Sequence, residues 1–171
     1  MSATVYKIKR SFTIPLMAIV ALLFILLVIS LFGRQPWETA ILALLFIISL
    51  AVGVESLRRE IVLSDSGLIL KKFFRRREFT WAEITNLATV AIKKKIYFLL
   101  TTTRGFYIFS NLLENHALLI RTLADKLGEE KVEAEVKNYL EHPVERISLI
   151  VMSWIAVLII IAVIILKVFG S

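Results

Sequence analysis

The chain has 171 residues and no cysteine, which excludes disulfides, thiolate metal sites and cysteine nucleophiles. Apolar residues make up 58% of it, too many for an ordinary soluble protein, and this indicates a membrane protein. The net charge of +7 is uneven, because residues 58–110 hold eleven Lys or Arg against four Asp or Glu, whereas residues 111–146 hold five against eight.

The first apolar run, residues 11–33, contains no charged residue and follows Lys7, Lys9 and Arg10. A bilayer core of about 30 Å needs about 20 helical residues, so this run is long enough to cross it. Basic residues before an apolar core also describe a secretory signal peptide, whose core would be about 7 to 15 residues long. Since this core is longer and a second apolar run follows at once, a membrane span is the favoured interpretation.

The second apolar run extends without charge from Thr39 to Val54, and Gly33 and Pro36 separate it from the first. Its length of 16 residues corresponds to about 24 Å of helix, so it spans a bilayer only with the help of its flanks. Two apolar runs joined by a short connection predict a transmembrane helical hairpin over residues 1–57.

A third uncharged run, residues 147–166, predicts a C-terminal transmembrane helix within 147–171. Basic residues near helix ends mark the cytoplasmic side of a membrane. They precede the first span and follow the second, at Arg58 and Arg59, whereas the connection between these spans carries Arg34 offset by Glu38. We therefore expect the N-terminus and the segment after the second span to be cytoplasmic.

After the second span, the pattern changes to short stretches of β-branched and aromatic residues separated by turns. Gly-containing turns at Asp65-Ser66-Gly67 and Thr103-Arg104-Gly105 help to delimit them. Such a pattern predicts a compact meander of strands. Six stretches are counted, near residues 60–64, 68–73, 77–81, 85–91, 96–101 and 106–109.

Two helices are predicted after the strands. Apolar residues recur at helical spacing up to Leu127, and Gly128 stands where a C-terminal cap is expected. Residues 129–141 then place apolar residues on one stripe and charged residues on the other face, which predicts an amphipathic helix in the segment 129–146. This helix could pack on the strand domain, on the membrane or on a partner.

No catalytic constellation is found in the sequence. His116 and His142 lack a second histidine or a carboxylate at metal-ligand spacing. The glycines form neither a phosphate loop nor a dinucleotide signature, and no predicted span has a charged residue at its centre. We therefore expect no enzyme activity, no metal and no cofactor.

Two basic clusters are candidate binding residues for lipid or a partner. They are Lys71, Lys72, Arg75, Arg76 and Arg77, which surround two phenylalanines, and Lys93, Lys94 and Lys95. Near a membrane surface, each basic residue contributes about 1 kcal/mol of attraction to anionic headgroups. A domain beside a negative leaflet could also be basic without binding any ligand. Nucleic acid is disfavoured as a partner, because the domain is tied to the bilayer by a very short link.

The order of strand, Asp65-Ser66-Gly67 turn, strand, basic turn and Trp81-Ala82-Glu83-Ile84 resembles bacterial pleckstrin-homology (PH-like) domains of membrane proteins. In those domains a W-x-E-I element follows the third strand, and a C-terminal helix closes a small barrel. The resemblance covers residues 60–127 and implies a binding or assembly module at 58–128. It also implies seven strands, one more than the six counted, with Trp81 and Ile84 plugging the barrel.

These features together predict an α+β membrane protein with three transmembrane helices and a small cytoplasmic PH-like β-barrel capped by a C-terminal helix. The expected location is the bacterial inner membrane. The leading hypothesis is a non-catalytic scaffold or assembly subunit, whose domain binds a protein partner, further copies of itself in an oligomer, or anionic lipid headgroups. The alternative is an accessory subunit of a transporter or channel complex.

Overall fold

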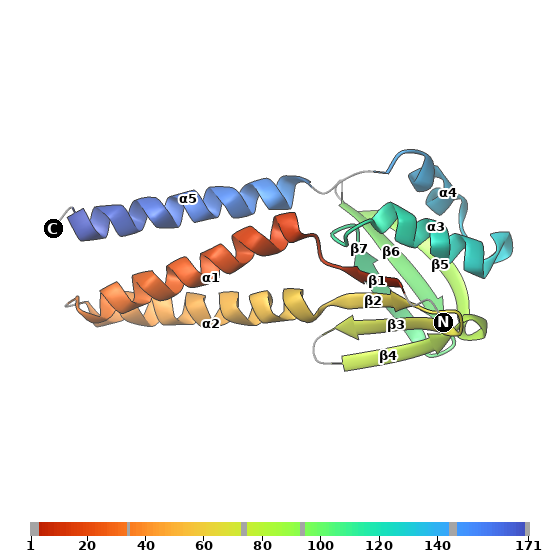
Figure 1. Ribbon diagram of the computed structural model, residues 1–171, viewed down its shortest axis with the longest axis horizontal. Coiled ribbons are helices and arrows are strands. Elements are labelled where there is room, and N and C mark those ends of the chain that lie inside the picture. Colours follow the sequence, from red (N-terminus) through yellow and green to blue (C-terminus); the bar gives the residue numbers. More distant parts are fainter. Residues whose placement is uncertain (1–3, 34, 73–74, 93–94, 144–146, 170–171) are drawn as a thin grey trace. The chain divides into compact units, whose positions relative to one another are not determined.

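The computed structural model describes residues 4–33, 35–72, 75–92, 95–143 and 147–169, and it divides the chain into two compact units (Figure 1). A helical unit holds residues 10–57 and 147–171, and a mixed unit holds residues 1–9 and 58–146. The predicted α+β class is confirmed. Each unit draws on two separate parts of the chain, so neither is a continuous segment.

Within the part that the structure describes, the helical unit consists of three long helices, α1 (Arg10–Leu31), α2 (Pro36–Arg58) and α5 (Ile147–Phe169). Each has 22 or 23 residues and is apolar enough to cross a membrane. This confirms the three predicted apolar helices. Many of their large apolar side chains are exposed, as in Ile47 and Leu158, which is the surface that a lipid-facing helix needs.

Apolar side chains from all three helices pack in the interior of this unit. Leu23, Leu26 and Leu42 are buried, and Ile160 and Ile164 of α5 pack against them. Near the α1–α2 connection, the hydroxyls of Ser30 and Thr39 lie 3.0 Å apart. The Thr39 hydroxyl is also placed to donate to the Ser30 carbonyl at 3.2 Å, so polar contacts hold the hairpin where its two helices meet.

An ion pair between Glu38 and Lys167 joins the first turn of α2 to the last turn of α5. The two side chains are only 33% and 25% exposed. The start of α2 and the end of α5 are therefore neighbours, and the α1–α2 connection and the end of α5 lie at the same end of this unit.

In its described residues, the mixed unit contains two antiparallel sheets (Figure 1). The first has the order β1-β2-β3-β4, with β1 (Thr4–Lys7), β2 (Glu60–Leu63), β3 (Gly67–Lys72) and β4 (Arg75–Thr80). The second has the order β5-β6-β7, with β5 (Ile84–Ile92), β6 (Lys95–Thr102) and β7 (Gly105–Ser110).

The strands in the described part of the chain form no closed barrel, which corrects that part of the expected architecture. After β4 the chain enters a short 3₁₀ helix, Trp81–Glu83. The next strand, β5, pairs with β6 and not with β4. The ladder of the first sheet therefore ends at β4, and a second sheet begins.

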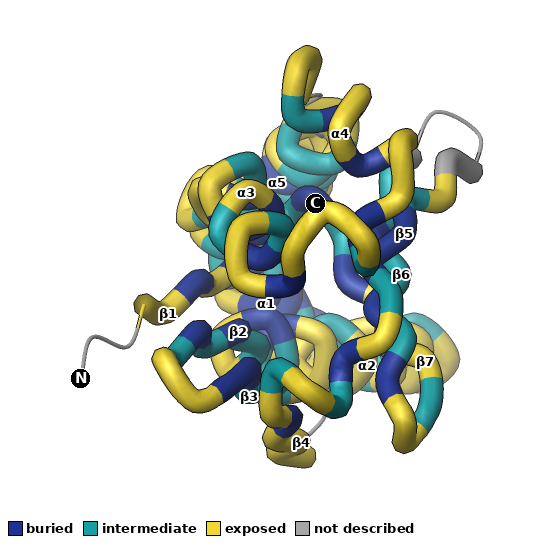
Figure 2. The backbone as a smooth tube through the Cα atoms, turned by 90° about the vertical axis from the view of Figure 1, so that its right-hand side faces the viewer, coloured by how far each residue is buried: buried dark blue, intermediate teal, exposed yellow. Residues whose placement is uncertain are grey.

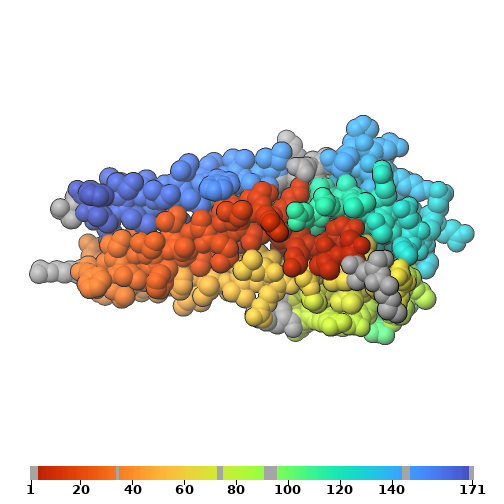
Figure 3. Space-filling view, viewed as in Figure 1, coloured from red at the N-terminus to blue at the C-terminus, as the bar shows by residue number. Residues whose placement is uncertain are grey.

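The strand β1 is not among the six predicted stretches. It pairs with β2 along its whole length, and Tyr6 at its centre is only 5% exposed. Beyond β1, the Lys9 amide donates to the Leu112 carbonyl at 2.9 Å, and Ile8 forms a bridge with Leu113. Figure 3 shows the N-terminal residues, in red, lying against the blue-green segment that follows β7. Residues before α1 thus link the first sheet to the segment that follows the second sheet.

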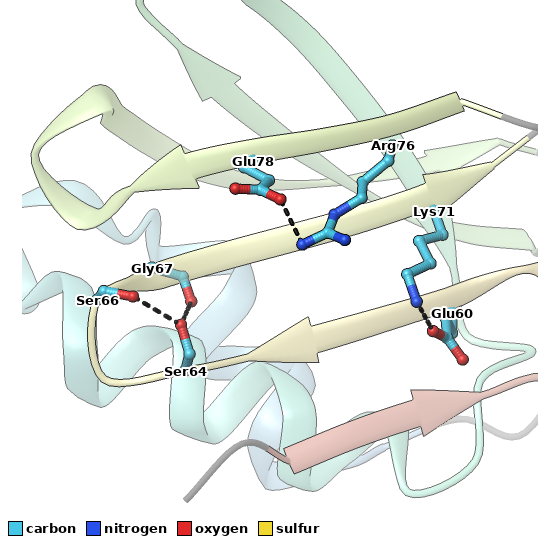
Figure 4. A network of polar contacts seen from close by, with 7 residues as sticks. All are labelled: Glu60, Ser64, Ser66, Gly67, Lys71, Arg76 and Glu78. Atoms are coloured by element: carbon cyan, nitrogen blue, oxygen red, sulfur yellow. Dashed lines mark hydrogen bonds and ion pairs between the residues drawn. The ribbon is translucent and has the colours of Figure 1, made fainter. Parts of the chain in front are cut away.

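The turn between β2 and β3 falls at the predicted Asp65-Ser66-Gly67. The Ser64 hydroxyl donates to the Gly67 carbonyl at 3.0 Å (Figure 4). A Cβ atom at position 67 would overlap the carbonyl oxygen of Phe79 on β4, so only glycine fits there. This glycine lets β3 approach β4 closely at the start of their ladder.

Two helices follow the strands in the described part of this unit, α3 (His116–Leu127) and α4 (Ala134–Glu141). Leu119, Ile120 and Leu123 of α3 are completely buried, and buried and exposed stretches alternate along both helices (Figure 2). Val136 of α4 is also completely buried, and the Tyr139 ring lies 5.0 Å from the Phe98 ring. The predicted amphipathic segment therefore packs on the strand domain.

Ile84 and Trp81 were both expected in the interior, and only Ile84 is there. Ile84 is completely buried, together with Phe98 and Leu100 of the second sheet. Trp81 is partly exposed, and its indole Nε1 donates to the Asp65 carbonyl at 3.0 Å. Trp81 therefore ties the short 3₁₀ helix to the β2–β3 turn and does not plug the core.

Candidate functional site

The first basic cluster lies at the open end of the β3–β4 hairpin. Lys71 and Lys72 end β3, and Arg75, Arg76 and Arg77 begin β4. In the ladder Lys71 lies opposite Arg76, and Lys72 lies opposite Arg75. The structure thus brings all five residues of this predicted cluster to one place, although the two phenylalanines between the strands lie outside the described residues.

Two pairs of like charges facing each other across a ladder are unfavourable. Carboxylates offset part of this cost: Lys71 forms an ion pair with Glu60, and Arg76 Nη2 lies 2.5 Å from Glu78 Oε1 (Figure 4). Exposed ion pairs contribute about 0–1 kcal/mol, and the Arg76 and Glu78 side chains are about 60% exposed. The hairpin end therefore keeps a strong excess of positive charge.

The basic residues divide between the two faces of the sheet, because side chains alternate along a strand. Leu68 of β3 and Phe79 of β4 lie opposite each other and are buried, which marks the inward face. Arg77 lies two residues before Phe79 and Arg75 lies four before it, so both share that face. The inward face of the hairpin thus changes from apolar to basic toward its open end.

A pocket of about 500 Å³ lies on this inward face, between the two sheets. Its walls are mainly apolar and come from the first sheet, β7 and the segments beside them: Ile8, Ile61, Leu70, Phe106, Tyr107, Ile108, Phe109, Leu112 and Leu113. Basic residues line it as well: Arg59, Lys71, Lys72, Arg75 and Arg77. Volume, apolar walls and a few convergent polar groups are the usual properties of a ligand site.

The strand β7 forms the wall across from the hairpin. Tyr107 and Phe109 face the core, where their rings lie 4.7 Å from Phe79 and 5.4 Å from Phe98. Phe106 and Ile108 alternate with them and are 71% and 56% exposed. The pocket therefore has large exposed apolar side chains as well as exposed arginines among its lining residues.

The second basic cluster is only partly described. Lys93 and Lys94 lie outside the described residues, and Lys95 is described in its backbone alone, as the first residue of β6 opposite Ile92. A binding role for these three lysines stays a prediction.

The two histidines lie in different settings. His116 is 5% exposed, and its ring lies 6.1 Å from that of Tyr139, which is the setting of a core residue. His142 is exposed at the end of α4. Among the described residues, no group of three or more His, Asp or Glu side chains is placed to hold a metal ion.

Sequence reasoning found the basic hairpin but missed the pocket behind it. The missed residues include Arg59, Ile8 and the β7 wall. One signal was present in the sequence: alternate residues of β3 read Leu68, Leu70, Lys72, which is an inward face that becomes charged before the strand ends. No such signal indicated Ile8, because its place in the pocket depends on pairing between segments that the α1–α2 hairpin separates in the sequence.

No family model, curated protein or solved structure matches this chain. The geometry and charge of the hairpin and its pocket are therefore the basis for a functional conclusion.

Proposed function

We propose that this chain is a non-catalytic membrane protein whose mixed unit is a PH-like domain that holds anionic lipid headgroups at the open end of the β3–β4 hairpin. One observation carries the proposal: Lys71 faces Arg76 and Lys72 faces Arg75 in the ladder, and the Glu60 and Glu78 carboxylates offset only part of the repulsion within these like-charge pairs. Bound phosphate oxygens would relieve this repulsion and accept hydrogen bonds from the arginines.

The topology supports the PH-like assignment. The described residues form seven strands, in sheets of four and three, followed by α3, which agrees with the strand number that the resemblance implies once Thr4–Lys7 is counted as the first strand. The Trp81-Ala82-Glu83-Ile84 element lies between the two sheets. In this chain the two helices α1 and α2 are inserted between the first and second strands of the domain.

Lipid is favoured over a second copy as the partner of this hairpin. The strand β4 is an edge of its sheet, and an edge strand can pair with another chain. Arginines on an edge oppose such pairing, because two copies would bring like charges together. The same arginines suit the anionic surface of a cytoplasmic leaflet. Orientation of the domain toward the cytoplasm, as the flanking charges predict, would place it beside such a leaflet.

Hydrogen exchange of the full chain in nanodiscs tests the proposal. We expect the amides of residues 67–72 and 75–80 to exchange more slowly in phosphatidylglycerol than in phosphatidylcholine. The difference should vanish at about 1 M salt, where the screening length falls to about 3 Å. Equal exchange in both lipids at low salt would contradict headgroup binding, and would leave a protein partner as the ligand of the hairpin.

A further inference from the structure

We propose that the pocket between the two sheets takes one acyl chain of an anionic phospholipid, whose headgroup rests on the arginines of the β3–β4 hairpin. This inference rests on the proposed function and goes beyond it. Surface attraction needs only exposed charge, whereas a chain-binding pocket selects a single lipid molecule.

The interior of the pocket suits a hydrocarbon chain. At about 500 Å³ it is within the range of small-molecule sites, about 300–1,000 Å³. Ile61, Phe109 and Leu113 are among its lining residues, and each is 5% exposed or less, so they belong to the packed core. An apolar chain would remove water from the remaining apolar wall, which is favourable in proportion to the area covered.

The charge of the pocket determines the chemistry at the other end of the ligand. Arg75 and Arg77 share the inward face, and Arg59, Lys71 and Lys72 also line the pocket. Glu60 is the acidic residue among the described lining residues, and it is already engaged with Lys71. A ligand with a negative headgroup therefore fits, whereas a zwitterionic one would bring its own cation against the arginines.

The chain itself points to the membrane as the source of this ligand. Ile8 lies two residues before the first residue of α1, and Arg59 is the first residue after α2. Both line the pocket, so two parts of its wall continue directly into helices of membrane-spanning length. Phe106 and Ile108, exposed at the pocket, add apolar surface of the kind that contacts lipid.

Photolabelling of the full chain tests this inference. The protein is reconstituted with phosphatidylglycerol that carries a diazirine on one acyl chain, irradiated, digested and analysed by mass spectrometry. We expect labels on peptides that contain residues 60–72 and 105–113, in addition to those from the three long helices. Phosphatidylcholine with the same modified chain should label the helices equally and these two segments several-fold less.

Matched variants on neighbouring positions separate a chain inside the pocket from a lipid nearby. Leu70→Trp fills the pocket and should reduce labelling of residues 105–113 several-fold. Ile69→Trp is the control, because Ile69 is also half-buried on β3 but its side chain points to the opposite face. At the basic end of the pocket, Arg77→Gln should reduce labelling of residues 105–113 more than Arg76→Gln, since Arg77 lines the pocket and Arg76 is not among its lining residues.

Labelling confined to α1, α2 and α5 would overturn the inference. Equal effects of Arg77→Gln and Arg76→Gln would also overturn it, and this comparison remains available if Leu70→Trp fails to fold. Headgroup binding can survive either result, because lipid-dependent exchange of the hairpin amides would persist without any acyl label. Loss of both signals would remove the proposed function as well.

Discussion

Tyr6 lies opposite Ile61 in the ladder between β1 and β2, although the entire α1–α2 hairpin separates them in the sequence. Both side chains are nearly buried, at 5% and 4% exposure. The membrane-length hairpin is thus an insertion between two adjacent strands of one sheet, and the strand domain needs residues from both sides of it.

A first prediction concerns a soluble form of the domain. Because Lys7 and Glu60 are ladder partners, a flexible Gly/Ser linker of about five residues can join Lys9 to Arg59 in place of the hairpin. Residues 4–9, the linker and residues 59–143 should form a soluble domain that unfolds cooperatively in urea. The fragment 59–143 alone should lack this transition or aggregate, since β2 becomes an open edge. Equal stability of the two fragments would mean that β1 contributes nothing.

A second prediction concerns the W-x-E-I element. Ile84→Ala should lower the free energy of unfolding by about 2–5 kcal/mol, because it opens a cavity in the packed core. Trp81→Phe should cost only about 0.5–1.5 kcal/mol, the contribution of its hydrogen bond to Asp65. Val90→Ala, at an exposed position of β5, is the control and should have little effect. Circular dichroism of the soluble domain during urea unfolding measures all three.

Most elements of the fold could be predicted from local sequence patterns. Uncharged runs of sufficient length predicted the three long helices, and Gly67 predicted the turn between β2 and β3. Glycine is required at that position because the backbone of β4 leaves no room for a side chain. The strand Thr4–Lys7 could not be predicted in this way. It is short, and its pairing partner lies beyond two helices, so no local pattern indicates it.

The candidate site was predictable only in part, for a similar reason. Charge is a local property, so the basic residues of the hairpin were evident from the sequence. A pocket depends on which strands face each other, and β7 meets the inward face of β3 and β4 only through the packing of two sheets. The split of Arg76 and Arg77 between opposite faces follows from strand alternation once the strand is known.

A third prediction concerns topology. The Glu38–Lys167 ion pair places the end of α5 beside the start of α2, so both should emerge on the same side of a membrane. Reporters fused after residue 169 and inserted near Gly33 should therefore give the same readout, and one inserted at Asp65 the opposite readout. Activity of a cytoplasmic reporter is expected only at Asp65, as the flanking basic residues predict. The same readout from all three reporters would contradict three crossings of the membrane.

A fourth prediction concerns stability at acid pH. The Thr80 backbone amide donates to Glu83 at 2.9 Å and, with the nearby Arg104 guanidinium, holds the pKa of Glu83 below its ordinary value of 4.5, while partial burial acts in the opposite direction. Because folding lowers this pKa, the stabilisation is fully present above pH 4.5 and is lost as the pH falls through the folded value.

Glu83→Gln should therefore flatten the dependence of unfolding on pH below about 4.5. Arg104→Gln should flatten it less, because the Thr80 amide is the larger cause of the shift. Urea midpoints of the soluble domain between pH 6 and pH 3 measure both. An unchanged slope in Glu83→Gln would show that other carboxylates govern acid unfolding.

The last prediction separates binding from stability at the basic hairpin. Lys72 faces Arg75 across the ladder, so Arg75→Glu replaces a repulsive pair with an attractive one. The substitution should stabilise the soluble domain by about 0.2–1 kcal/mol in urea unfolding. In the full chain, the same substitution should weaken the phosphatidylglycerol-dependent protection of the hairpin amides, because it removes one cation and adds an anion.

Arg77→Glu is the matched control for this prediction. Arg77 faces Leu70 and not a charged residue, so its reversal should weaken lipid-dependent protection without a gain in stability. If Arg75 served only the fold, reversing its charge would not be expected to stabilise the domain. If Arg75→Glu instead destabilises the domain and leaves the hairpin protection unchanged, the arginine serves the fold, and the headgroup proposal loses the observation that carries it.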